Sequence, residues 1–109
     1  MEEVIWNLEE AVEFARHLEK FLSCEGFHCA LTGSCLYKGE SFKDVDIMIY
    51  PNDVSMQNFE VARFLLSDAD VKNLKNYAKI HNFKKKYPDS KEIWCGEYNS
   101  KRVDFFFVR

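Results

Sequence analysis

The amino-acid sequence predicts a two-layer α+β (α/β) fold, in which a mixed β-sheet carries its helices on one face. Two observations lead to this prediction. Helical and strand patterns follow one another in the order α, β, β, α, α, β, β, and the strand segments alternate apolar and polar residues. The 109 residues are 47% hydrophobic and 30% charged, so we expect one small domain spanning residues 1–109.

The first half of the chain is predicted to form one helix and two strands. Apolar residues recur at helical spacing from Glu2 to Ser23, and Gly26 is placed to end that helix. His28–Thr32 reads as a short strand that enters a turn at Gly33. A second strand is expected over Lys43–Tyr50, before a Pro-Asn-Asp turn.

The second half is predicted to form two helices and a β-hairpin. Ser55 is expected to cap a helix that runs to about Leu66. Asp68–Phe83 is also predicted to be helical, from the helical spacing of Val71, Leu74, Ala78 and Ile80. The segments EIWCGEY and KRVDFFFV, joined by Asn-Ser, predict two strands and a tight turn.

Charge, hydropathy and cysteine content exclude several classes of protein. A net charge of −3 gives no overall basic surface for generic nucleic-acid binding. No apolar run reaches the roughly 20 residues that span a bilayer, and the acidic start is unlike a secretory signal, so we expect a cytoplasmic protein without membrane attachment. The four cysteines have no CxxC spacing and are expected to be free thiols.

Two strands carry aspartates in otherwise apolar runs. Because strand side chains alternate faces, each strand has one wholly apolar side: Val45, Ile47 and Ile49 in one, and Val103, Phe105 and Phe107 in the other. If the two strands are neighbours and bury these rows under the helices, Asp44, Asp46 and Asp104 converge on the opposite face. The alternatives are solvated carboxylates at a strand edge and, for Asp104, a salt bridge to Lys101 or Arg102.

Such a group of carboxylates suits a metal site. Residues two apart on a strand have Cα atoms about 6.5 Å apart, and adjacent strands lie about 4.8 Å apart. Three like charges at this spacing would raise one another's pKa values, and a divalent cation removes that repulsion. We therefore expect Asp44, Asp46 and Asp104 to bind Mg²⁺, or Mn²⁺ in its place.

The Gly33-Ser34 pair supplies the features of a phosphate-binding turn. Glycine allows the backbone to pass close to a ligand, and Ser34 adds a hydroxyl donor. A short helix starting at Ser34 and reaching Lys38 would direct free N–H groups at an anion. Lys38 and Lys43 are further candidate phosphate contacts, although surface lysines are more often simply solvated.

The ordered motifs resemble the DNA polymerase β-like nucleotidyltransferase superfamily, in particular its minimal, single-domain members. The resemblance rests on ALTGS, then DVDIMIY about ten residues later, then VDFFFV near the end of the chain. It implies a nucleotidyltransferase-like fold. It also implies that Gly33 and Ser34 bind nucleotide phosphates, that Asp44 and Asp46 hold the metals, and that Asp104 completes the site.

The function that this resemblance implies is Mg²⁺-dependent transfer of an NMP group from an NTP to an acceptor, with release of pyrophosphate. The acceptor is a protein, a nucleic acid or a small molecule; in relatives of this size it can be a companion helical protein, as in a toxin–antitoxin pair. A homo-oligomer is left open. The alternatives are a catalytically inactive nucleotide- or protein-binding module of the same fold, and a plain structural domain.

Overall fold

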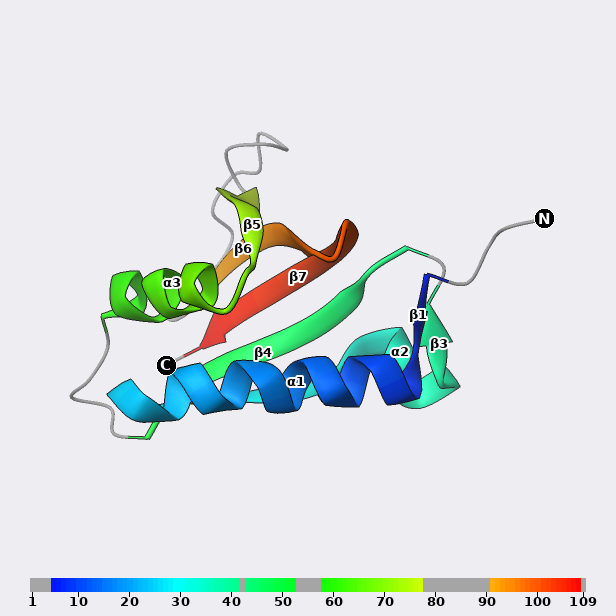
Figure 1. The fold of residues 1–109 in the computed structure, drawn as a ribbon, viewed down its shortest axis with the longest axis horizontal. Coiled ribbons are helices and arrows are strands. Elements are labelled where there is room, and N and C mark those ends of the chain that lie inside the picture. The colour runs from blue at the N-terminus through cyan, green and yellow to red at the C-terminus, as the bar shows by residue number, and fades with distance from the viewer. Residues whose placement is uncertain (1–4, 42, 53–57, 78–90, 109) are drawn as a thin grey trace.

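A five-stranded mixed sheet organises the computed structural model, which describes residues 5–41, 43–52, 58–77 and 91–108 (Figure 1). The strands lie in the order β2 (Phe27–Thr32), β4 (Val45–Pro51), β7 (Lys101–Val108), β6 (Lys91–Tyr98) and β5 (Lys72–Asn76). The central neighbours β4 and β7 run parallel, and all other neighbours run antiparallel. The predicted mixed sheet is therefore confirmed.

Two helices, α1 (Leu8–Leu22) and α3 (Phe59–Asp68), lie side by side on one face of this sheet (Figure 1). Their apolar stripes meet the inward rows of β4 and β7. Phe14, Leu18, Ile47 and Phe105 are each at most 2% exposed. Burying side chains of this size contributes about 1.5–3 kcal/mol each. The predicted two-layer α+β arrangement is confirmed, and it leaves the opposite face of the sheet uncovered by these helices.

The prediction that the first helix starts at Glu2 is wrong at its beginning. Trp6 belongs to a short strand, β1 (Trp6–Asn7), and pairs with Ser41 of β3 (Glu40–Ser41). Asn7 then caps α1, because its side-chain oxygen accepts a hydrogen bond from the Glu10 N–H at 2.8 Å. At the other end, the chain passes through a 3₁₀ turn to Gly26 in the left-handed conformation, as predicted.

Three other predicted boundaries move by a few residues. β4 begins at Val45, so Asp44 immediately precedes the strand instead of lying inside it. A short helix, α2, spans Gly33–Lys38, as the phosphate-turn interpretation required. α3 begins at Phe59, with Asn58 as its cap; the predicted cap, Ser55, lies outside the described residues.

The predicted helix over Asp68–Phe83 is wrong where the structure describes it, because Lys72–Asn76 forms the edge strand β5. Its pairing with β6 shifts register between Lys72 and Lys75, and Asn73 has a positive φ of 55°. Such an irregularity interrupts strand alternation. Val71 and Leu74 therefore both pack near Gly96. Their three-residue spacing imitates a helix; the segment beyond residue 77 lies outside the described residues.

The C-terminal hairpin agrees with its prediction. β6 and β7 pair in continuous register from Lys91 opposite Val108 to Tyr98 opposite Lys101. Asn99 and Ser100 both have positive φ, at 51° and 64°, which is the backbone of a tight two-residue hairpin turn. This hairpin fixes β7, and β7 carries Asp104 to the middle of the sheet.

The structure also bears on the predictions about cysteines and membrane-spanning helices. Cys24, Cys29, Cys35 and Cys95 are all free, as predicted. Within the described part of the chain, the helices are too short or too polar to cross a bilayer.

Candidate active site

Three carboxylates meet at the centre of the sheet, as the strand pattern predicted. Asp46 of β4 and Asp104 of β7 are direct register partners on adjacent parallel strands. Asp44 is contributed by the residue that enters β4. Ligand-capable oxygen atoms of the three side chains all lie within 4.8 Å of one another. Residues separated by about sixty positions in the sequence thus form one acidic cluster.

Strand alternation explains why this cluster is accessible. Val45, Ile47, Val103 and Phe105 point toward the helices and are fully buried. Their neighbours of opposite parity, including the three aspartates, point to the other face and are only partly buried. The cluster therefore has a hydrophobic core behind it and an open side in front, where a ligand can approach.

The electrostatics of the cluster are those of crowded like charges. Burial, followed by the charges of Asp44 and Asp104, raises the pKa of Asp46 to about 6. Burial and the adjacent Asp104 also raise the pKa of Asp44. The pKa values of both carboxyl groups are thus held above their ordinary range by burial and by neighbouring carboxylates. This is the environment that a bound cation would relieve.

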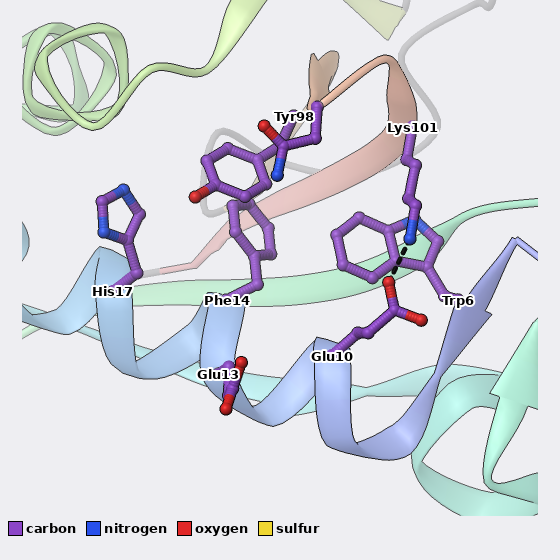
Figure 2. A pocket seen from close by; sticks show the side chains of 8 residues that line it. Trp6, Glu10, Glu13, Phe14, His17, Tyr98 and Lys101 are labelled. Carbon is purple, nitrogen blue, oxygen red and sulfur yellow. Dashed lines mark hydrogen bonds and ion pairs between the residues drawn. The ribbon is translucent and has the colours of Figure 1, made fainter.

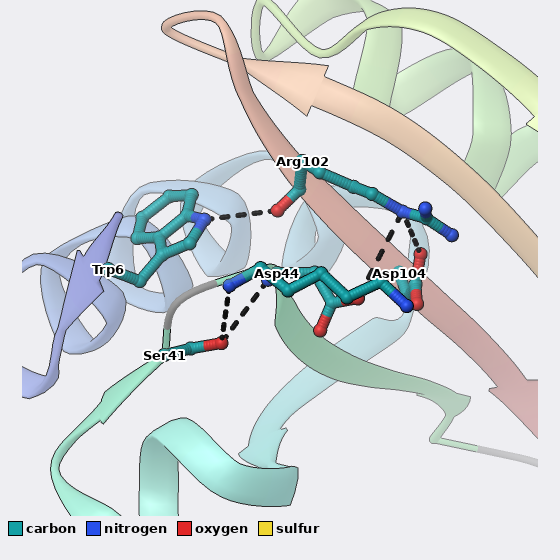
Figure 3. Close-up of polar contacts among 6 residues, drawn as sticks. Trp6, Ser41, Asp44, Arg102 and Asp104 are labelled. Atoms are coloured by element: carbon teal, nitrogen blue, oxygen red, sulfur yellow. Dashed lines mark hydrogen bonds and ion pairs between the residues drawn. The ribbon is translucent and has the colours of Figure 1, made fainter. Parts of the chain in front are cut away.

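Arg102 provides a positive charge within the protein itself. Its Nε lies 3.2 Å from Asp104 Oδ1 and 4.0 Å from Asp44 Oδ2, so its guanidinium group lies beside two of the three carboxylates (Figure 3). The alternative that the sequence offers for Asp104 is a salt bridge to Lys101 or Arg102. The structure contains both features: the salt bridge exists, and the carboxylate cluster exists around it.

Gly33 packs directly against Asp46. A Cβ atom at this position would lie 2.0 Å from Asp46 Oδ2 and 2.8 Å from its Cγ, and the residue has a φ of +77°. Glycine is therefore required twice over, by the left-handed backbone and by the carboxylate beside it. The turn that starts α2 is held against the acidic cluster at this contact, so the two predicted halves of the site are neighbours.

Ser41 holds the entrance to β4 and was not predicted. It is only 5% exposed, and its Oγ accepts hydrogen bonds from the backbone N–H groups of Lys43 at 3.3 Å and Asp44 at 3.2 Å (Figure 3). The bonds fix the backbone from which the Asp44 side chain projects. A signal was present, since serine is followed three residues later by an acid, the spacing typical of such local side-chain-to-backbone bonds.

The predicted phosphate contacts divide into two groups. The charge of Lys43 lowers the pKa values of both Asp44 and Asp46, so Lys43 lies within electrostatic reach of the cluster. Ser34 is exposed in the first turn of α2, next to Gly33. Lys38 is exposed at the far end of α2, and the structure gives it no contact with the carboxylates. The phosphate-binding roles of all four residues stay predictions.

The donor set fits a hard divalent cation. Carboxylate oxygens are the ligands that Mg²⁺ and Mn²⁺ prefer, and three of them converge without an intervening histidine or thiolate ligand among the described residues. Cys95 is the register partner of Asp104, but burial raises the pKa of its thiol, which disfavours the thiolate that a soft metal would need.

Comparison with known proteins bears on the fold. No protein-family model matches the sequence, and no curated protein matches it. Among solved structures, the chain is similar to polymerase beta of Leishmania infantum in a ternary P/T complex, with a TM-score of 0.62 and 16% sequence identity. The match covers 97% of this chain and 43% of the polymerase chain. This chain has a polymerase β-like fold.

Proposed function

We propose that this protein is a metal-dependent nucleotidyltransferase that moves an NMP group from an NTP to an acceptor and releases pyrophosphate. The observation that carries the proposal is the convergence of three carboxylates within 4.8 Å on the open face of the sheet. The fold similarity to polymerase beta supports the same class of chemistry. Nucleotidyl transfer relies on positioning of the reactants and on charge neutralisation more than on a protein nucleophile. A metal held by these carboxylates would supply both the positioning and the neutralising charge.

In this proposal each residue of the site has a distinct role. Asp44, Asp46 and Asp104 hold Mg²⁺ or Mn²⁺, and Asp104 also helps to activate the acceptor hydroxyl. The bound metal supplies neutralising charge to the transferred phosphoryl group and to the attacking oxygen. Ser34, on the turn at Gly33, donates to the phosphates of the NTP.

The two lysines have weaker support than the carboxylates. Lys43 is proposed to add positive charge near the phosphates, because its charge already reaches Asp44 and Asp46. Lys38 would act only if the triphosphate extends along α2, since it is exposed at the end of that helix. We therefore expect a larger loss of nucleotide binding from Lys43→Ala than from Lys38→Ala.

Ligand binding is the first experiment. Thermal unfolding should be followed with each NTP, with and without Mg²⁺. A ligand present at 100 times its Kd stabilises a protein by about 2.7 kcal/mol, which is easily seen as a rise in Tm. We expect a rise that needs both NTP and Mg²⁺ and that is lost in Asp46→Asn. Asp68→Asn removes an exposed acid of α3 and is the matched control.

Transfer is the second experiment. Labelled NTPs should be incubated with Mg²⁺ and candidate acceptors, and we propose a companion helical protein as the first acceptor to test. Asp44→Asn and Asp104→Asn should each reduce transfer at least about a hundredfold, while Asp68→Asn leaves it unchanged. Nucleotide binding without transfer to any acceptor would support the inactive binding module instead. If neither binding nor transfer is observed, both functions are refuted.

A further inference from the structure

A concave site lies on the helix-bearing side of the sheet, away from the carboxylate cluster. Between α1 and the β6–β7 hairpin is a pocket of about 340 Å³ (Figure 2). Lys101 lines it and shares strand parity with the buried Val103, whereas Arg102 and Asp104 have the opposite parity. The volume is within the range of about 300–1,000 Å³ that is typical of ligand pockets.

Aromatic rings border this pocket: Tyr98 is half-buried, whereas Trp6 and Phe14 are each 2% exposed. The ring centroids of Trp6 and Phe14 are 5.4 Å apart, and those of Phe14 and Tyr98 are 4.5 Å apart. Figure 2 shows the three rings gathered between the start of α1 and the hairpin. Aromatic faces carry negative electrostatic potential and attract cations. The pocket already contains one such contact, because Lys101 Nζ lies 5.0 Å from the centre of the Trp6 ring.

The charges of the pocket leave one carboxylate uncompensated. Glu10 and Lys101 form an ion pair, so they neutralise each other (Figure 2). Glu13 also lines the pocket and has no ion-pair partner among the described residues. His17 also lines the pocket, and its Nε2 is bonded to the carbonyl of Ala69 at 2.9 Å. Counted over Glu10, Glu13 and Lys101, the site has a net charge of −1.

We propose that this pocket binds a guanidinium group, as carried by an arginine side chain or a small alkylguanidine. A flat cation stacks on the accessible part of the Tyr98 ring and offers a fork of N–H donors that fits a carboxylate such as Glu13. An ammonium group has no flat face to stack and is more strongly hydrated, which makes it the poorer ligand. An anion is disfavoured by the net charge. This binding is separate from the proposed nucleotidyl transfer and does not depend on it.

Trp6 provides a direct reporter for the test. The chain has two tryptophans, and Trp94 lies outside the pocket, where its indole donates to Glu92 and its ring contacts Arg63. A Trp94→Phe variant of the full chain therefore reports on Trp6 alone. Its fluorescence should be titrated at pH 8 with the peptide acetyl-Gly-Arg-Gly-amide, and with matched peptides that contain citrulline or lysine. Citrulline keeps the shape of arginine without its charge.

We expect saturable binding of the arginine peptide, with the lysine peptide at least fivefold weaker and the citrulline peptide at least tenfold weaker. Glu13→Gln should weaken arginine binding about fivefold, the scale of an exposed ion pair. Glu9→Gln, which removes an exposed charge of the same helix outside the pocket, should leave binding unchanged. Tyr98→Leu should weaken binding through loss of a ring, and circular dichroism would show that each variant is folded.

A comparison of two probes identifies the source of the guanidinium. Equal affinity for ethylguanidinium and for the arginine peptide indicates a small-molecule ligand, and tighter binding of the peptide indicates a segment of a partner protein. Both outcomes support the proposed chemistry. Failure of both probes to bind, equal binding of the citrulline peptide, or no effect of Glu13→Gln in a folded variant would overturn it.

Discussion

The contact between Gly33 and Asp46 leads to the sharpest prediction, because the chain contains its own control. Gly33 and Gly39 stand at the two ends of α2 with nearly identical positive φ angles, +77° and +79°. A Cβ at Gly33 would collide with Asp46 at 2.0 Å, whereas a Cβ at Gly39 would have no atom within 4 Å. Alanine at either position therefore carries the cost of a left-handed backbone, but only at position 33 does it also clash with another side chain.

The shared cost is the left-handed backbone, which disfavours alanine by about 1–2 kcal/mol. At Gly33 the Asp46 carboxyl must also rotate away, and its own Cβ, 3.0 Å from the new atom, limits that movement. A side chain forced from its preferred rotamer costs about 0.5–1.5 kcal/mol. We expect Gly39→Ala to lower the free energy of unfolding by about 1–2 kcal/mol, and Gly33→Ala to lower it by about 2–3 kcal/mol.

Urea-induced unfolding, followed by circular dichroism without metal, measures both values. In the same variants, the rise of Tm with Mg²⁺ and NTP should persist in Gly39→Ala and disappear in Gly33→Ala, because only the latter displaces a proposed metal ligand. Equal destabilisation of the two variants would refute the packing argument. A Tm rise fully retained in Gly33→Ala would instead show that the position of Asp46 does not matter for binding.

Three further predictions concern the carboxylate cluster, the entrance to β4 and the edge strand. The pKa of Asp46 is raised from 3.8 to about 6, so between these pH values the native state binds more protons than the unfolded state. The metal-free protein should therefore lose about 1–3 kcal/mol of stability as the pH rises from about 4 to about 6. Asp46→Asn should flatten that part of the pH profile measured by urea unfolding, and an unchanged slope would contradict the assigned cause. Ser41→Ala should cost about 1–3 kcal/mol by leaving two backbone N–H groups without their acceptor, whereas Ser41→Thr keeps the hydroxyl and should cost clearly less. Gly96→Ala should destabilise the protein by about 1–3 kcal/mol, because the new Cβ would lie 3.0 Å from a Val71 methyl and 3.2 Å from the Lys72 carbonyl. A variant as stable as the wild type would mean that β5 does not pack on β6 in this way.

The sequence alone was sufficient for the centre of the sheet and for its acidic cluster. Strand alternation is a local property, so the letters of DVDIMIY and VDFFFV already separate the buried row from the aspartate row. The hydrophobic rows then favour one solution, in which β4 and β7 bury the same face. In the structure β4 and β7 are neighbours, as that solution requires, and Asp46 and Asp104 are also register partners, which the letters alone do not specify.

Only the tertiary structure determined the features that depend on contacts between distant segments. Trp6 pairs with Ser41 and donates its indole N–H to the Arg102 carbonyl at 3.0 Å, and neither partner can be read from the N-terminal sequence. The three-residue spacing of Val71 and Leu74 indicated a helix until pairing with β6 placed an irregularity between them. The pocket beside α1 likewise needs the hairpin to be placed against the helix. Periodicity reports which face of a segment is apolar, but the identity of the segment that covers it is a property of the whole chain.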